Sequence, residues 1–356
     1  MLKNMKKSTK SNAITLGIVV GFYVLIQILS AAGALTNSFS GQLVPICAYV
    51  IMAVSLNLTV GMLGELSLGH AGFMSVGAFS GTLVYVVMSE NAPQPLALLL
   101  AFVVGGAVAG LFGVLVGIPV LRLSGDYLAI VTLAFGEIVK NVMNACYLGV
   151  DSHGLHFSLK DSASLNLEVD GKVLINGAMG ITGIKKASTF TIGIVLVIIT
   201  LLVILNLVNS RAGRAIMAIR DNRIAAESIG INITKYKLLA FSISAGLAGI
   251  AGVLYAHNLT TLTALPKNFG YNMSIMILVY VVLGGIGNIR GSVIATVILY
   301  LLPEMLRGLS NYRMLMYAIV LILAMLFNSA PQFVVLRERV AEKFSRKDKK
   351  PAKEAA

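Results

Sequence analysis

The chain has no tryptophan and only two cysteines among its 356 residues. Cys47 and Cys146 both lie in apolar segments, so we expect buried thiols rather than a disulfide framework. Charge is also scarce, because Asp, Glu, Lys and Arg together make up only 12% of the residues. A typical soluble domain carries about twice that fraction. With 57% hydrophobic residues, the composition is that of a polytopic membrane protein.

The motifs of enzymes and nucleotide-binding proteins are missing as well. Gly171-Lys172 is not a P-loop, because it lacks the upstream glycine and the following hydroxyl, so the chain cannot bind ATP in that way. His153 and His156 stand without further ligand spacing and predict a solvated pair rather than a metal site. No nucleophile–base pattern stands out. We therefore predict no catalytic residue, no cofactor and no metal.

The acidic residues number 15 against 28 Lys and Arg, which gives a net charge of +13. Such a balance could indicate nucleic-acid binding, but the distribution argues against it. Twenty of the 28 basic residues fall in the tail 1–12, at Arg122 and Arg290, in the central segment 209–237 and in the tail 331–356. This pattern is the positive-inside bias of a protein embedded in membrane lipid. We expect a membrane protein with both termini in the cytoplasm and no nucleic-acid partner.

Ten apolar segments predict an all-α membrane bundle of about ten transmembrane helices within residues 13–330. They lie at about 13–32, 43–62, 67–88, 96–118, 126–149, 190–208, 238–258, 272–287, 291–307 and 313–329. Ten crossings place 150–189 outside and 209–237 in the cytoplasm. We expect the first span to be retained, although Ala32-Gly33-Ala34 resembles a signal-peptidase site. The short segment 272–287 could be tilted, broken or partly re-entrant.

Small residues recur at intervals that suit close helix packing. In lipid no hydrophobic force draws helices together, so close backbone approach supplies the packing. These residues predict a tight bundle, and the alternative is that some of their faces slide during transport. The set is Gly77, Gly81, Gly106, Gly110, Gly113, Gly117 and the small residues of 245–252.

The stretch 61–72 places several glycines, Glu65 and His70 at a junction between spans. Irregular backbone at membrane depth persists only where protein or a water-filled cavity covers it. The stretch is therefore either a broken helix that lines a pathway or a tight turn near the cytosolic surface with a solvated Glu65. A similar glycine-rich stretch at 284–291 could echo it as an internal repeat.

Glu137 lies about 11 residues into the span that begins at Asp126, or about 16 Å deep at the helical rise. An intramembrane carboxylate is costly and is a candidate for a functional site. Lys140, at i+3, offers the alternative of a structural ion pair.

The central segment 209–237, here called the basic segment, alternates small, apolar and basic residues at helical spacing. Asn222 is a good N-cap, Arg223 and Glu227 stand at i,i+4, and Gly230 suits a C-cap. We predict two short helices at an angle, presented to the cytosol for a soluble partner to grip. The alternative is a basic amphipathic segment on anionic lipid.

Four blocks resemble the membrane subunits of ATP-binding-cassette importers for branched-chain amino acids, of the LivM type. They are residues 64–81, 121–138, 210–255 and 281–295. The resemblance implies a type II importer-like bundle of about ten helices that forms the pathway for branched-chain (hydrophobic) amino acids. It implies a sister permease of the LivH type, two cytosolic ATPase subunits and an extracytoplasmic binding protein. The chain departs from the pattern at 150–175, which resembles an insertion, and at Lys185, where proline is usual.

Together these interpretations predict a site on this chain that couples it to the ATPase, and a set of pathway residues. Ile216, Ile219 and Ile224 would fill a groove on the ATPase, and Arg220 and Arg223 would meet acidic residues on its rim. The predicted coupling residues are Arg214, Ile216, Ile219, Arg220, Asp221, Arg223, Ile224, Glu227 and Gly230, and the pathway candidates are Glu65, His70 and Glu137. Two alternatives stay open: the same machine carrying urea, short amides or a sugar, and an ion-coupled secondary transporter.

Overall fold

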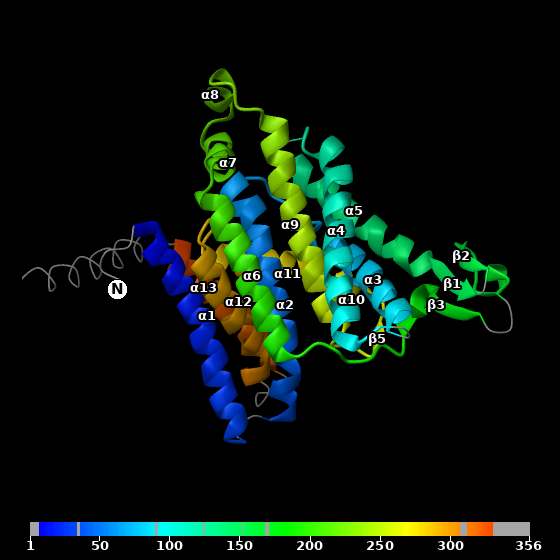
Figure 1. The fold of residues 1–356 in the computed structure, drawn as a ribbon. Coiled ribbons are helices and arrows are strands. Elements are labelled where there is room, and N and C mark those ends of the chain that lie inside the picture. The colour runs from blue at the N-terminus through cyan, green and yellow to red at the C-terminus, as the bar shows by residue number, and fades with distance from the viewer. Residues whose placement is uncertain are drawn as a thin grey trace, which may run out of the picture. The chain divides into compact units, whose positions relative to one another are not determined.

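The computed structural model describes residues 7–33, 36–89, 92–123, 125–151, 153–167, 171–306 and 312–329. The chain divides into two compact units, Met1–Val297 and Ile298–Ala356. The predicted tail 331–356 lies outside the described residues, and the first helix begins at Lys7 rather than near residue 13. Nearly all described secondary structure is helical (Figure 1).

Each predicted span contains a helix. The helices are α1 (Lys7–Ala31), α2 (Asn37–Asn57), α3 (His70–Met88), α4 (Gln94–Val120), α5 (Asp126–Ala145), α6 (Phe190–Asn209), α7 (Arg211–Asp221), α8 (Arg223–Ser228), α9 (Ile233–Ala256), α10 (Pro266–Phe269), α11 (Tyr271–Gly284), α12 (Ile289–Met305) and α13 (Arg313–Ser329). The prediction of an all-α polytopic membrane protein is confirmed.

Among the described residues, seven helices are long and apolar enough to cross a membrane. They are α1 from Asn12 onward, α2 with its continuation to Leu63, α3, α4, α5, α6 and α9. The helices α11, α12 and α13 are shorter, at 14, 17 and 17 residues. The short α11 agrees with the short apolar segment 272–287, and the count of ten crossings stays a prediction.

Helix α9 packs against α2, α3 and α4 at the centre of the first unit. Its contacts with α3 and α4 depend on glycines, as the sequence predicts. A β-carbon on Gly77 of α3 would lie 2.2 Å from the Cα of Gly249 on α9. A β-carbon on Gly249 would in turn lie 2.6 Å from the Gly105 carbonyl of α4. Three backbones therefore meet where no side chain intervenes, which is how helices associate without a hydrophobic force between them.

The segment 150–189 contains strands that the sequence analysis did not predict. A three-stranded antiparallel sheet has the order β2 (Gly154–Ser158), β1 (Tyr147–Asp151), β3 (Lys172–Asn176), and β4 (Ile181–Thr182) pairs with β5 (Thr261–Leu262). In Figure 1 this sheet follows the end of α5.

The turn between β1 and β2 keeps both histidines accessible to solvent, as predicted, and gives one of them a carboxylate partner. The Asp151 carboxylate accepts hydrogen bonds from the N–H groups of His153 and Gly154, and its Oδ2 lies 2.9 Å from His156 Nε2. Desolvation opposes ionisation of Asp151, but these hydrogen bonds outweigh it and hold the pKa of that carboxyl below its ordinary value. His156 therefore has a carboxylate partner. The described residues contain no group of three or more His, Cys, Asp or Glu that could hold a metal ion.

Candidate functional site

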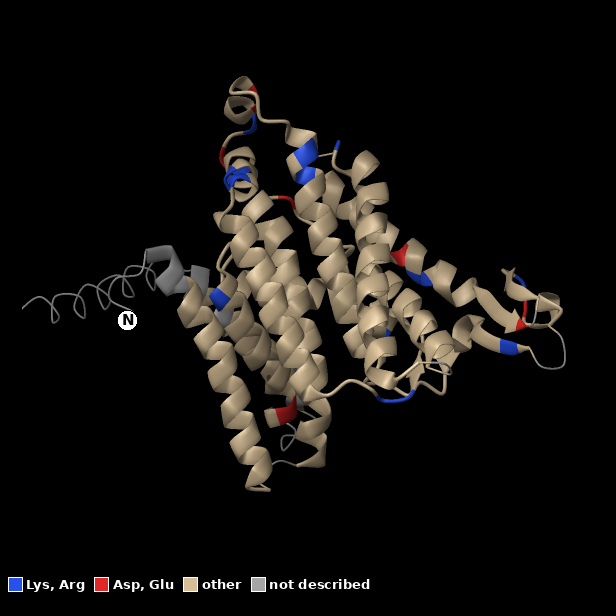
Figure 2. Ribbon diagram, in the orientation of Figure 1, with Lys and Arg blue, Asp and Glu red and all other residues tan. Residues whose placement is uncertain are grey.

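The basic segment folds as two short helices, α7 and α8, as predicted. Each begins at a side-chain N-cap: Ser210 Oγ accepts from the Gly213 N–H, and Asn222 Oδ1 accepts from the Ala225 N–H. Asn232 caps the start of α9 in the same way. Such caps satisfy backbone donors that a helix start leaves free. Lys and Arg gather at this end of the bundle, around α7, α8 and the first turn of α9 (Figure 2).

Gly230 closes α8 with left-handed backbone, at φ +83°, which confirms the predicted C-cap. Its N–H donates to the Glu227 carbonyl, and the Ile231 N–H donates to the Ala226 carbonyl. Glycine adopts this conformation without the strain that a β-carbon adds.

The predicted role of Ile216 and Ile219 as groove-filling residues is wrong. Both side chains are buried within the chain, and Ile219 packs with Ala226 and Ile233. Of the three predicted isoleucines only Ile224 is exposed, at 81%, and Ile229, which the sequence analysis did not name, is exposed at 75%. The sequence shows that these isoleucines are apolar but not which helix face turns toward the bundle.

Arg220 also differs from its predicted position on a partner's rim. Its Nη1 donates to the Gly61 carbonyl at 2.8 Å, and its Nε and Nη2 donate to Asp221 Oδ1. The guanidinium is thus engaged by its own chain, although the side chain stays 39% exposed. Arg214 donates to the Asn209 carbonyl.

On α8, Arg223 and Glu227 are both exposed. They stand at i,i+4 on this helix, as the sequence indicates, but no ion pair joins them in the part of the chain that the structure describes. Their side chains are therefore open to a partner.

The stretch 61–72 does interrupt the helix. Helix α2 continues as a π-helical turn, η2 (Leu58–Leu63), which ends at Gly64 with φ +79°, and α3 begins only at His70. We call residues 58–69 the helix break. A π-helical turn inside a helix is uncommon and is frequent at functional sites.

Glu65, within the helix break, is not solvated as the tight-turn alternative supposed. Its carboxylate pairs with the ammonium of Lys237 in the first turns of α9, and the two side chains are only 12% and 5% exposed. The pairing compensates both charges for the loss of water.

His70, the first residue of α3, is buried, and its Nε2 lies 2.8 Å from Ser55 Oγ. The Ser55 hydroxyl donates to the Met52 carbonyl, so the imidazole N–H is the donor to Ser55. His70 therefore links the start of α3 to α2, and its predicted place in a pathway stays a prediction.

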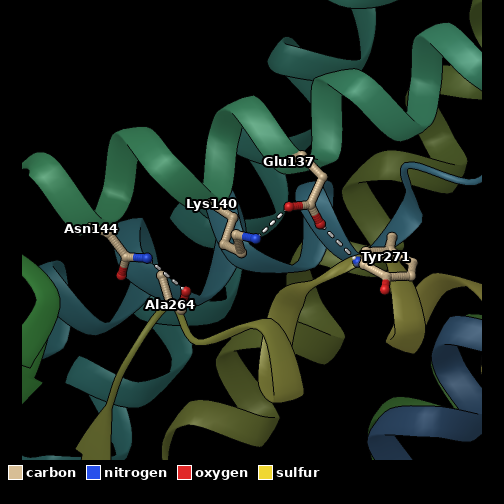
Figure 3. Close-up of polar contacts among 5 residues, drawn as sticks. All are labelled: Glu137, Lys140, Asn144, Ala264 and Tyr271. Carbon is tan, nitrogen blue, oxygen red and sulfur yellow. Dashed lines mark hydrogen bonds and ion pairs between the residues drawn. The ribbon is translucent and has the colours of Figure 1, made fainter.

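Glu137 and Lys140 form the ion pair that the sequence offered as an alternative (Figure 3). The other carboxylate oxygen of Glu137 accepts the N–H of Tyr271, the first residue of α11, at 2.9 Å. One turn further on, Asn144 donates to the Ala264 carbonyl. These contacts tie α5 to the segment 264–271 and favour a structural role for Glu137.

The turn 285–288 lies against the helix break, a contact that the sequence analysis did not predict. Asn57, just before η2, accepts the Gly287 N–H at 2.9 Å and donates to Ser292 Oγ at 2.8 Å. The two glycine-rich stretches therefore meet through an asparagine 230 residues from its partner. An asparagine in an apolar run was the one signal that could have drawn attention to this contact.

Comparisons with known proteins agree with this architecture. The family model described as branched-chain amino acid transport system / permease component matches residues 38–325. The high-affinity branched-chain amino acid transport system permease protein LivM of Salmonella typhimurium is 34% identical over 291 residues, which cover 78% of this chain and 66% of the relative. The LivM protein of Escherichia coli is 33% identical over 289 residues, with the same coverage.

The chain thus spans about two thirds of the length of these LivM relatives. The high-affinity permease protein LivH of Salmonella typhimurium is 26% identical over 260 residues, covering 70% of this chain and 79% of the relative. No solved structure matches. The match over residues 38–325 includes the helix break, Glu137 and the whole basic segment, and by it the chain belongs to the family of branched-chain amino acid transport system permease components.

Proposed function

We propose that this chain is the membrane-spanning permease subunit of an ATP-binding-cassette importer, forming the pathway for branched-chain amino acids. The observation that carries the proposal is the capped helix pair α7–α8. It presents Ile224 and Ile229 to solvent at the basic end of a bundle that matches the permease family. The basic end would face the cytoplasm of a bacterial inner membrane, with both termini on that side.

The proposed machine needs partners that hydrolyse ATP, because this sequence has no P-loop. Two cytosolic ATPase subunits would supply this activity, and α7–α8 would be the site where this chain binds an ATPase. A sister permease of the LivH type would complete the pathway, and an extracytoplasmic binding protein would deliver the cargo. The chain itself would be no enzyme and would need no cofactor.

The sugar alternative has support from one comparison. The ribose import permease protein RbsC of Escherichia coli is 33% identical over 132 residues, covering 35% of this chain and 40% of the relative. The LivM matches cover more than twice that share of the chain, which favours branched-chain amino acids.

The ion-coupled alternative has less support. A secondary transporter needs ionisable groups that exchange partners near the midplane. Here Glu137 and Glu65 are each paired with a lysine of the same chain.

The dependence on partners is directly testable. Purified alone into liposomes, the chain is expected to show neither ATPase activity nor concentrative leucine uptake. Together with the sister permease, the ATPases and the binding protein, it should accumulate leucine only when ATP is present inside. The measurements are phosphate release and uptake of radiolabelled leucine. Ion-driven uptake by the lone subunit would contradict the importer function. ATP-driven uptake of ribose but not leucine would show that the transported molecule is a sugar.

Docking of the ATPase should depend on the exposed isoleucines. Replacing Ile224 by aspartate removes an apolar side chain from the contact, and we expect ATPase co-purification to fall about tenfold or more, as for a truncated interface anchor. Leu155→Asp is the matched control, because Leu155 is also exposed, at 72%, but lies on β2. If Ile224→Asp retained the ATPase as fully as Leu155→Asp, α7–α8 would be a lipid-surface segment instead.

A further inference from the structure

The side chain of Arg220 joins the basic segment to η2, which continues α2. The last carbonyls of a helix have no partner within the helix and carry its negative dipole end. Gly61 contributes one of these carbonyls, and Arg220 Nη1 donates to it at 2.8 Å. Asp221 holds the other side of the guanidinium through two hydrogen bonds, so its plane is fixed.

Close packing accompanies this hydrogen bond. A β-carbon on Gly64 would lie 2.7 Å from Arg220 Cγ, and one on Gly61 would lie 2.4 Å from the Gly287 amide nitrogen. The stem of Arg220 therefore packs on the end of η2, and the Asn57 side chain joins that end to the turn 285–288. Because these segments are closely packed, a displacement of α7 must also displace the residues that it contacts.

A second contact joins the other end of the basic segment to the same break. Lys237, the last residue of the basic segment and already part of α9, pairs with Glu65. The basic segment thus contacts the helix break at two points, Gly61 and Glu65, with the left-handed Gly64 between them.

From these contacts we propose that Arg220 and Lys237 are positioning residues that transmit movement of the basic segment to the helix break 58–69. The inference rests on the proposed function, since an ATPase at α7–α8 would supply the movement. The break suits this role because a π-helical turn and a left-handed glycine can absorb backbone rotation that a regular helix resists. Neither residue contacts cargo in this scheme.

The test uses the complete importer with binding protein in proteoliposomes. Arg220→Ala removes both the bond to Gly61 and the packing on Gly64. We expect the ATPase to stay bound while the leucine imported per ATP hydrolysed falls about tenfold, as for the loss of a charge-assisted hydrogen bond. Arg220→Lys should recover part of the ratio, because an ammonium can still donate to the Gly61 carbonyl. Arg211→Ala is the control: Arg211 is also basic, exposed and on α7.

A wild-type ratio in Arg220→Ala would overturn the inference, and so would loss of the ATPase from Arg220→Ala but not from Arg211→Ala. In the second case Arg220 would be a docking contact. If the Arg220→Ala protein cannot be produced in folded form, a second variant tests the other contact. The double variant Glu65→Gln with Lys237→Met removes that contact without leaving a charge unpaired. It should lower the same ratio, and a wild-type ratio would count against the proposal.

Amide hydrogen exchange separates this inference from the proposed function. Arg220→Ala should speed exchange of the amides at 58–66 and leave the interior of α9 unchanged, with or without an ATPase present. If the wild-type complex imported no leucine but exchange responded in this way, the proposed function would fail and the structural link would stand. Unchanged exchange at 58–66 would remove the link.

Discussion

Gly249→Ala is expected to destabilise the bundle strongly. The new β-carbon would lie 2.4 Å from the Ala109 β-carbon and 2.6 Å from the Gly105 carbonyl oxygen. Helix α9 cannot back away, because Gly77 of α3 touches the Gly249 backbone from another side. Overpacking of this kind costs about 1–3 kcal/mol, and we expect about 3 kcal/mol because two of the obstructing groups belong to backbone.

The matched control for this variant is Gly110→Ala, on the same pair of helices. The nearest atom to a β-carbon at Gly110 lies at 3.6 Å, an ordinary contact distance. Thermal unfolding in detergent, followed by loss of the monodisperse peak, should show a clear decrease for Gly249→Ala and little change for Gly110→Ala. Equal stabilities would mean that the helices at Gly249 are less closely packed than the structure shows.

The sequence predicted the bundle because its signals are local. A membrane helix needs a long apolar run, and a helix start needs a capping side chain within three residues of the N–H that it accepts. The spans, the paired helices α7–α8 and the Gly230 cap follow from such signals. The close packing at the glycines could also be predicted from the sequence, since close approach of helices in lipid requires small residues.

The contacts that build the candidate site are not local. Arg220 and Gly61 are separated by 159 residues, and Lys237 and Glu65 by 172. The sequence shows the charge of Arg220 but not whether it meets a partner protein or the end of another helix. The same limit explains the error over Ile216 and Ile219, whose helix has an apolar side that faces its own bundle.

The strands at 147–176 escaped prediction for a different reason. Each strand is only five residues long, and a search for long apolar runs passes over them. Their turn depends on Asp151, which accepts two backbone N–H groups.

Glu137→Gln should lower the stability of the permease by about 2 kcal/mol, between the effects of breaking an exposed and a buried ion pair, because Glu137 is partly exposed and Lys140 is buried. Lys140 is buried, and the neutral amide that replaces the Glu137 carboxylate cannot balance its charge. The oxygen of that amide can still accept the Tyr271 N–H, so the link to α11 survives. The loss therefore measures the ion pair alone.

The double variant Glu137→Gln with Lys140→Met decides between the structural pair and a pathway residue. It removes both charges and keeps an unbranched side chain at 140. The unfolding temperature in detergent should therefore be close to that of the wild-type protein. If Glu137 only neutralises Lys140, leucine import by the reconstituted complex should return with stability. A stable double variant that assembles and hydrolyses ATP but imports little leucine would place the Glu137 carboxylate in the movement of cargo. We expect import to recover, because both carboxylate oxygens already have partners within the chain.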